Sequence, residues 1–213
     1  MPANAAVVGY CQAEPELRGI TAPLTHAGKF MSELLLRLYK DHTRLRRLMD
    51  VLEDEAARIP SDGSARVIVR DVLDYMTSYP DRFHHPVENE LFEVLATVNV
   101  RLGVCVARLQ GEHEWIVAEG RKLLLLAAGT PPPAQLVSRL KRYADHQRQH
   151  MRVEEAEVFQ PAARELDPVR WRRLAQGTEG GPDPLFGLVV QERYRELYAY
   201  IMRRHSRDSV RKR

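Results

Sequence analysis

Cysteine is scarce in this chain, and its two cysteines are far apart. Cys11 and Cys105 lie in different parts of the sequence, and neither belongs to a Cys-x-x-Cys pair. A disulfide framework requires several cysteines, and a thiolate zinc site requires closely spaced ones. We therefore expect neither, and the cysteine content fits a reducing compartment.

Long hydrophobic runs are absent as well. The longest apolar runs, such as LLLLAA at residues 123–128, are far shorter than the roughly 18 residues that a membrane span needs. The first residues, MPANAAVVGYCQAEPE, contain no basic stretch followed by a long apolar one, so a secretory signal is not expected. Both absences predict a cytoplasmic protein that does not enter a membrane.

An excess of charge of one sign is also lacking. The 32 lysines and arginines face 29 acidic residues, which gives a net charge of +3. Such an even balance does not predict binding to nucleic acid. Basic residues concentrate in RRHSRDSVRKR at residues 203–213, a composition typical of a solvated tail that also offers a surface for a protein partner.

What the chain does contain is helical periodicity. Apolar residues recur three and four apart in four long segments, and no two-residue alternation typical of strands competes with them. Stretches rich in proline and glycine separate these segments. We predict helices at residues 32–59 with Ser32 as the N-cap, at 65–79 and onward to 98 after a break caused by two prolines, at 102–128, at 134–166, near Trp171, and at 185–205.

This pattern predicts an all-α protein with the architecture of an up-down-up-down four-helix bundle and an additional C-terminal helix. Short loops between consecutive helices imply that neighbouring helices run antiparallel. We expect a flexible N-terminal arm at residues 1–29, the bundle at 30–166, and a C-terminal helical extension with the basic tail at 167–213.

Each predicted bundle helix carries a histidine on the stripe that it would bury. Two of these histidines are followed one turn later by a glutamate, as His84-x3-Glu88 and His150-x3-Glu154. The four stripes are Leu35, Leu38, His42, Leu45, Met49 and Leu52; His84, Glu88, Leu91, Leu95 and Val98; Leu102, Val106, Leu109, His113, Ile116, Gly120 and Leu123; and Leu136, Leu140, Tyr143, Gln147, His150, Glu154 and Glu157.

The joint pattern predicts a metal site. A single buried histidine is more often a hydrogen-bonded core residue than a ligand, and a His–Glu pair one turn apart is more often a surface contact. Two buried carboxylates among four imidazoles, however, would each cost several kcal/mol unless a cation neutralises them. Transition metals such as iron bind both groups, and helix bundles build dinuclear sites from them.

Four stretches resemble the hemerythrin-like family of bacterial type, also called the HHE cation-binding domain. They are DHTRLRRLM at 41–49, YPDRFHHPVENELF at 79–92, GEHE at 111–114 and HMRVEEAEVFQPAA at 150–163, so the resemblance covers residues of about 35 to 165. It implies a four-helix bundle with a non-haem di-iron centre, in which two iron ions are bridged by two carboxylates and by an oxo or hydroxo group.

The resemblance also implies the ligands. The positions that match the family's ligands are His42, His84, Glu88, His113, His150 and Glu154, with the two glutamates as the bridging pair. The family commonly uses five histidines, so one is missing from this set. His85 is our candidate, because Pro86 disfavours helical geometry for the residue before it and would let both adjacent rings turn inward. His146, one turn before His150, is the alternative.

Two departures from the family bear on function. Val117 stands where the oxygen-carrying members have a second histidine on the third helix, and Glu154 and Glu155 follow His150 where those members end in His-x4-Asp. Fewer imidazoles leave an iron more open, which favours reaction over reversible oxygen carriage. We expect a protein that binds, senses or reduces oxygen, peroxide or nitric oxide. The alternatives are a non-enzymatic sensor of iron or oxygen status that acts through a protein partner, and a bundle that holds zinc or no metal.

Overall fold

The computed structural model describes residues 26–177 and 181–211, and all regular structure in these ranges is helical. This confirms the predicted all-α class. Residues 1–25 of the predicted N-terminal arm lie outside the described residues. The elements are α1 (His26–Arg58), α2 (Ala65–Met76), η1 (Pro80–His84), α3 (His85–Val98), η2 (Val100–Leu102), α4 (Gly103–Ala128), α5 (Pro133–Glu154), η3 (Glu155–Phe159), α6 (Gln160–Glu165), α7 (Pro168–Gly177), η4 (Glu192–Tyr194) and α8 (Arg195–Arg211).

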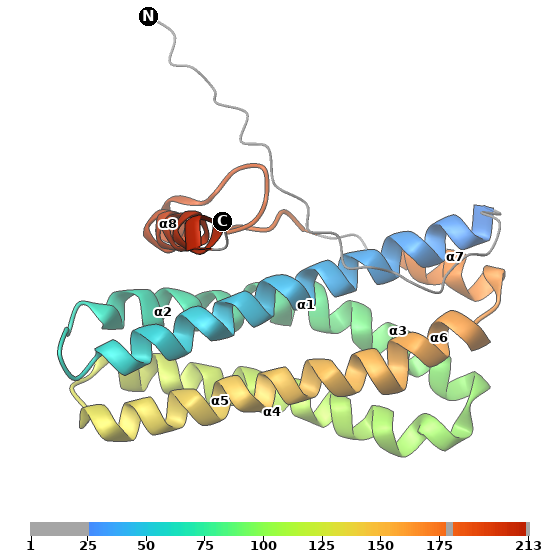
Figure 1. Ribbon diagram of the computed structural model, residues 1–213. Helices are drawn as coiled ribbons and strands as arrows, with labels where there is room; N and C mark the ends of the chain where they lie inside the picture. The colour runs from blue at the N-terminus through green and yellow to red at the C-terminus, as the bar shows by residue number, and fades with distance from the viewer. Residues whose placement is uncertain (1–25, 178–180, 212–213) are drawn as a thin grey trace, which may run out of the picture.

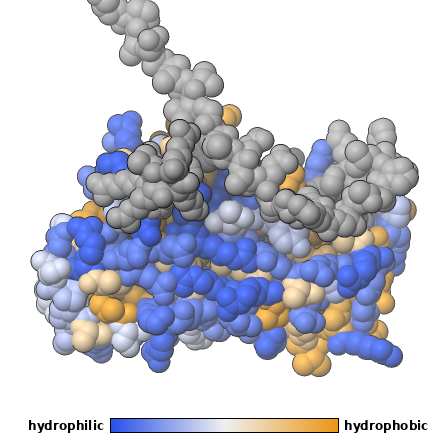
Figure 2. Space-filling model, in the orientation of Figure 1, coloured by the Kyte–Doolittle hydropathy of each residue, from blue (hydrophilic) through white to orange (hydrophobic). Residues whose placement is uncertain are grey.

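Four arms form the predicted bundle (Figure 1). The first arm is α1 and the third is α4, while the second joins α2 to α3 through η1 and the fourth runs from α5 through η3 into α6. The first and third arms each pack against α2 and α5. The face shown in Figure 2 is mostly hydrophilic, and none of the described helices combines the length and the apolar character needed to cross a membrane.

The elements after residue 166 pack on the bundle. α7 lies against the first half of α1, and α8 lies across the bundle beside α2 (Figure 1). Trp171 and Leu174 of α7 join the apolar core at one end of the bundle, whereas Leu185 and Leu197 join the core at the other end. The additional C-terminal helix is therefore present, and the division into three parts at residues 29 and 166 stays a prediction.

The core consists of two separate apolar clusters. One includes Leu45, Leu73 and Leu140, and the other includes Leu38 and Phe92. Along α1, Leu38 belongs to one cluster and Leu45 to the other, and the buried His42 lies between them. A layer of polar side chains therefore separates the two apolar clusters of the bundle core.

Two predicted helix ends are wrong. α1 begins at His26, so Ser32 lies inside the helix and not at its N-cap. The last helix begins at Arg195 instead of 185, because the Asp183 carboxylate accepts hydrogen bonds from the backbone N–H groups of residues 185 and 186, at 2.9 and 2.8 Å. These bonds hold a turn where the periodicity alone indicated a helix.

One predicted core position is wrong for a related reason. Glu157 is exposed, and Val158 and Phe159 are buried in its place. The cause is η3, which is a π-helical segment that begins directly after Glu154. Its wider turn carries the buried stripe one or two residues further along the chain than a regular helix would.

Candidate metal centre

Six buried side chains from all four arms form the polar layer between the two clusters. Their exposed fractions do not exceed 4%, and both glutamates are fully buried. The six are His42 of α1, His84 of η1, Glu88 of α3, His113 of α4, and His150 and Glu154 of α5. The structure therefore brings together the six residues that match the family's ligand positions.

The six side chains divide into two groups, each with two histidines and one glutamate. Glu88 Oε1 lies 3.0 Å from His42 Nε2 and 3.1 Å from His84 Nε2. Glu154 Oε1 lies 3.1 Å from His113 Nε2 and 3.0 Å from His150 Nε2. Each group places three donor atoms close enough together to hold one metal ion. We call them the His42/His84 position and the His113/His150 position.

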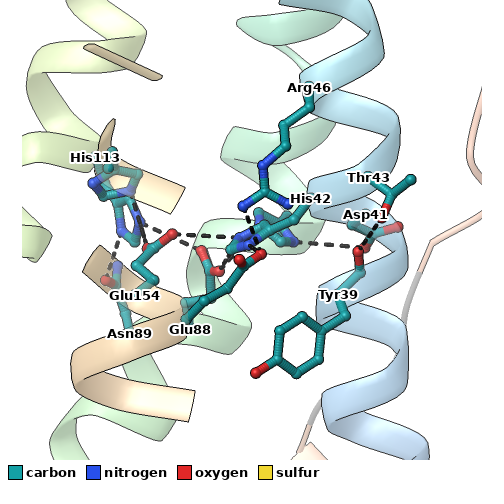
Figure 3. A network of polar contacts seen from close by, with 12 residues as sticks. Tyr39, Asp41, His42, Thr43, Arg46, Glu88, Asn89, His113 and Glu154 are labelled. Atoms are coloured by element: carbon teal, nitrogen blue, oxygen red, sulfur yellow. Dashed lines mark hydrogen bonds and ion pairs between the residues drawn. The ribbon is translucent and has the colours of Figure 1, made fainter. Parts of the chain in front are cut away.

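Each glutamate also reaches the other position with its second oxygen. Glu88 Oε2 lies 3.4 Å from His113 Nε2, and Glu154 Oε2 lies 3.3 Å from His42 Nε2. Figure 3 shows the two carboxylates side by side between His42 and His113. Each carboxylate therefore directs one oxygen to the His42/His84 position and the other oxygen to the His113/His150 position. This is the arrangement needed for a pair of carboxylates that bridge two metal ions.

Two π-helical segments adjoin this layer. η1 ends at His84, whose backbone is distorted (φ −103°, ψ −62°), whereas His85 has ordinary helical angles (φ −56°, ψ −37°). The prediction that Pro86 takes His85 out of helical geometry is therefore wrong. Both rings are buried because the wide π turn before them changes the direction in which successive side chains leave the helix.

His85 lies beside the His113/His150 position. Its ring stacks on that of His113, with centroids 4.2 Å apart and planes 12° apart, and its Nδ1 makes no hydrogen bond. Burial and the charges of neighbouring histidines hold its pKa well below the usual value, so it is a neutral imidazole. His146, the alternative, is only partly buried and lies against Trp115 instead, with ring centroids 4.2 Å apart.

The outward nitrogens of the four histidines have acidic or amide partners that our sequence reasoning did not assign. Each partner comes from a neighbouring arm, and the four contacts form a closed ring around the bundle. Asp41 Oδ2 lies 3.5 Å from His84 Nδ1, Asn89 Oδ1 lies 2.9 Å from His113 Nδ1, Glu112 Oε2 lies 2.8 Å from His150 Nδ1, and Glu155 Oε1 lies 2.8 Å from His42 Nδ1. Metal-binding histidines are typically oriented by such contacts.

Arginines pair with the three carboxylates of this ring. Arg44 lies 3.3 Å from Asp41, Arg46 lies 2.7 Å from Glu155, and Arg108 lies 3.7 Å from Glu112. Figure 3 shows Arg46 extending from α1 toward the polar layer. These arginines therefore neutralise the carboxylates of the ring. The charges of the two central glutamates, by contrast, require a cation in the centre of the layer.

The donor chemistry of the layer fits a metal. Carboxylate and amide oxygens only accept, so His42, His113 and His150 donate their Nδ1–H outward, and His84 Nδ1 faces the Asp41 carboxylate at 3.5 Å. A neutral ring in this orientation turns the lone pair of Nε2 inward. Nε2 then faces carboxylate oxygens, which are acceptors too. The buried atoms Glu88 Oε2, Glu154 Oε2 and His150 Nε2 make no hydrogen bond despite these short distances. Lone pairs that converge in this way require a cation between them.

Protons are the cations that compete with metal for these sites. Burial alone would lower the pKa of His84, but the charge of Glu88 and the contact with Asp41 raise it to about 9. Burial alone would also lower the pKa of His150, but the charge of Glu154 and the hydrogen bond to Glu112 raise it to about 9. Metal binding should therefore release protons and strengthen as pH rises.

A pocket of about 320 Å³ lies next to the His113/His150 position, between α3 and α4. His85 and His113 form part of its wall, and Asn89, Gln110 and Glu114 supply polar groups. A small molecule in this pocket would touch the edge of the polar layer. The pocket is open to solvent, unlike the six side chains of the layer itself.

Comparison with known families gives a clear result. The family model described as the hemerythrin HHE cation binding domain matches residues 34–162. The chain belongs to this family. The match spans all six side chains of the polar layer and stops before α7. Neither the curated proteins nor the solved structures contain a match to this chain.

Proposed function

We propose that this HHE domain is a non-haem di-iron protein that binds, senses or reduces oxygen, peroxide or nitric oxide. The observation that carries the proposal is the pair of buried glutamates, each facing both histidine pairs. Two histidines and one carboxylate at each position are the donor set that non-haem iron proteins use while leaving coordination positions open. The proposed ligands are His42, His84, His85, Glu88, His113, His150 and Glu154.

The residues of this chain would then have separate tasks. The inward nitrogens and the glutamate oxygens hold the metal pair, and the ring of outer partners fixes the orientation of each imidazole. His85 adds a third imidazole to the His113/His150 position. The two apolar clusters keep water away from the layer on both sides. When bound, iron would supply the capacity to bind or reduce a small oxidant.

The pocket supports a route for that small molecule. It reaches His85 and His113, and its polar lining favours a ligand that forms hydrogen bonds, such as hydrogen peroxide. The proposed direction of approach is therefore the His113/His150 position. Turnover of the small molecule is what distinguishes reduction from sensing.

The second candidate function is a non-enzymatic sensor of iron or oxygen status that signals through a protein partner. The observation that favours it is the packing of the C-terminal segment on the bundle next to Asp41, which supports His84. A segment in this place could respond to the metal content of the layer.

One experiment tests the main proposal. Protein produced in iron-sufficient cells is analysed for metal and by optical spectroscopy, and is then exposed to oxygen, hydrogen peroxide and nitric oxide. We expect two iron ions per chain and an absorption band that responds to at least one of these molecules. Stoichiometric zinc, or no metal after anaerobic purification, would contradict the proposal. Turnover of peroxide or nitric oxide indicates an enzyme, and stable binding without turnover indicates the sensor.

A further inference from the structure

One of the three arginines around the polar layer connects it to the C-terminal segment. Arg44 Nη1 lies 3.3 Å from Asp41 Oδ1 and 3.2 Å from Asp183 Oδ2. Asp41 in turn contacts His84 at 3.5 Å. Within the described part of the chain, Arg46 pairs with Glu155 of η3 and Arg108 with Glu112 of α4, and neither pairs with a residue beyond 166. The His42/His84 position is therefore linked to the C-terminal segment by side-chain contacts.

Asp183 is the anchor at the other end of this connection. Its carboxylate is buried and accepts hydrogen bonds from the Tyr75 hydroxyl at 3.3 Å and from two backbone N–H groups, those of Leu185 and Phe186. Arg44 also lies over the Phe186 ring, 5.4 Å from its centroid. The turn at residues 183–186 thus depends on a carboxylate that Arg44 holds in place.

The same segment covers the turn that presents His84. A Cβ atom added to Gly181 would collide with the Phe83 ring, so the segment passes directly over the last residue before His84. The carbonyl oxygen of Phe83 accepts a hydrogen bond from Arg37 Nη2 at 3.0 Å. Residues 181–186 therefore contact the support of the His42/His84 position at two places, through Arg44 and through Phe83.

We propose that residues 181–186 belong to the support of the His42/His84 metal position, with Arg44 and Asp183 as positioning residues, and that docking of this segment reports whether the position holds metal. The inference rests on the proposed metal site and deepens the sensor function. Metal that fixes His84 also fixes Asp41 and Arg44, which favours the docked turn. Coupling of this kind is reciprocal, so the docked turn favours metal by the same factor.

The first test measures hydrogen exchange at two amides in the full chain, with and without ferrous iron under anaerobic conditions. We expect the amides of Leu185 and Phe186 to exchange at least about 5-fold faster without metal, the lower end of typical coupling between sites. The chain contains a matched control, because the Asp167 carboxylate accepts hydrogen bonds from the N–H groups of Val169 and Arg170 at 2.9 Å at the exposed start of α7. These two amides should not respond to iron.

The second test separates the Arg44 connection from a general effect of charge. In Arg44→Gln, we expect one of two ferrous ions to bind at least about 5-fold more weakly, and the exchange at residues 185 and 186 to lose its dependence on iron. Arg46→Gln removes the same charge from the same metal position but leaves Asp183 untouched. It should retain the iron-dependent exchange. Asp183→Asn, which leaves all residues of the polar layer in place, should behave like Arg44→Gln.

The outcomes are distinct. Failure of the wild-type protein to bind ferrous iron would overturn the proposed function. Binding of two ions with unchanged exchange at residues 185 and 186 would overturn only the present inference, as would loss of the iron dependence in Arg46→Gln. If Arg44→Gln does not fold, as judged by circular dichroism, the wild-type exchange comparison and Asp183→Asn still decide the matter.

Discussion

Replacement of Glu88 by glutamine is the sharpest perturbation of the polar layer. The change preserves the size of the side chain and removes its charge. Glu88 is fully buried and contacts three histidines, at 3.0, 3.1 and 3.4 Å. Glutamine keeps one oxygen and replaces the other with an NH2 group, so the change removes an oxygen ligand from one proposed metal position and the negative charge from both. In the metal-free protein it leaves protonated imidazoles without their charged partner.

The expected magnitude follows from this burial. Breaking a buried charge pair by removing one partner typically costs about 3–5 kcal/mol. For a chain of about this size, 1 kcal/mol lowers the melting temperature by about 2–4 °C, so the metal-free variant should melt about 6–20 °C below the wild type. With metal present at 100 times its dissociation constant, the wild type gains roughly 2.7 kcal/mol that the variant lacks. The difference should therefore widen when metal is added.

The assay is thermal unfolding followed by circular dichroism, combined with metal analysis, for Glu88→Gln and for Glu114→Gln. Glu114 is the control because it adjoins His113 in the sequence but is exposed, and it should change stability by less than about 0.5 kcal/mol. A Glu88→Gln variant that keeps two metal ions and its melting temperature would refute the assignment. Loss of metal in Glu114→Gln would show that the ligand set is incomplete.

Three further results are expected. The pKa of His84 and of His150 is about 9 in the folded metal-free protein and 6.5 in an ordinary histidine, so their stabilisation is full below pH 6.5 and is lost as pH rises through 9. Urea unfolding of metal-free protein should show this decline, and a gain in stability over that window would contradict the pKa assignment. His85→Gln should weaken one metal position by at least about 10-fold and spare the other in a ferrous titration; equal binding would exclude His85 as a ligand. Gly120→Ala places a Cβ 2.6 Å from a threonine methyl and 2.9 Å from a tyrosine hydroxyl, and should cost about 1–3 kcal/mol, whereas Gly111→Ala on the same helix meets nothing within 4 Å and should stabilise the protein by up to ~1 kcal/mol.

Much of the centre could be predicted because its inward-facing residues follow helical periodicity. A histidine at the same depth on each buried stripe, with a glutamate one turn after two of them, identified the six side chains of the polar layer. Periodicity can be read from the local sequence, and residues that recur at helical spacing share the face of the helix that is buried in the core. The family resemblance and the stripes led to the same residues independently.

The outer ring could not be predicted in this way. Its members stand next to the inward-facing residues in the sequence, as Asp41 precedes His42 and Asn89 follows Glu88. Each, however, contacts a histidine of another arm, so its partner depends on how the arms are placed around the bundle. The reason for the burial of His85 was missed too, because a π turn has no reliable sequence signal apart from nearby proline.

The ring of outer contacts has a consequence for how the four arms align lengthwise. Apolar stripes of a bundle can slide past one another by whole turns and still bury leucine against leucine, and polar contacts in a core restrict such alternatives. In this chain Asn89, Glu112 and Glu155 each accept a hydrogen bond from a histidine of the next arm, and Asp41 contacts His84 at 3.5 Å. The contact of Glu155 returns to the first arm, which closes the ring. Sliding any one arm by a turn would break two contacts at once. The closed ring therefore specifies the register of all four arms before any metal binds.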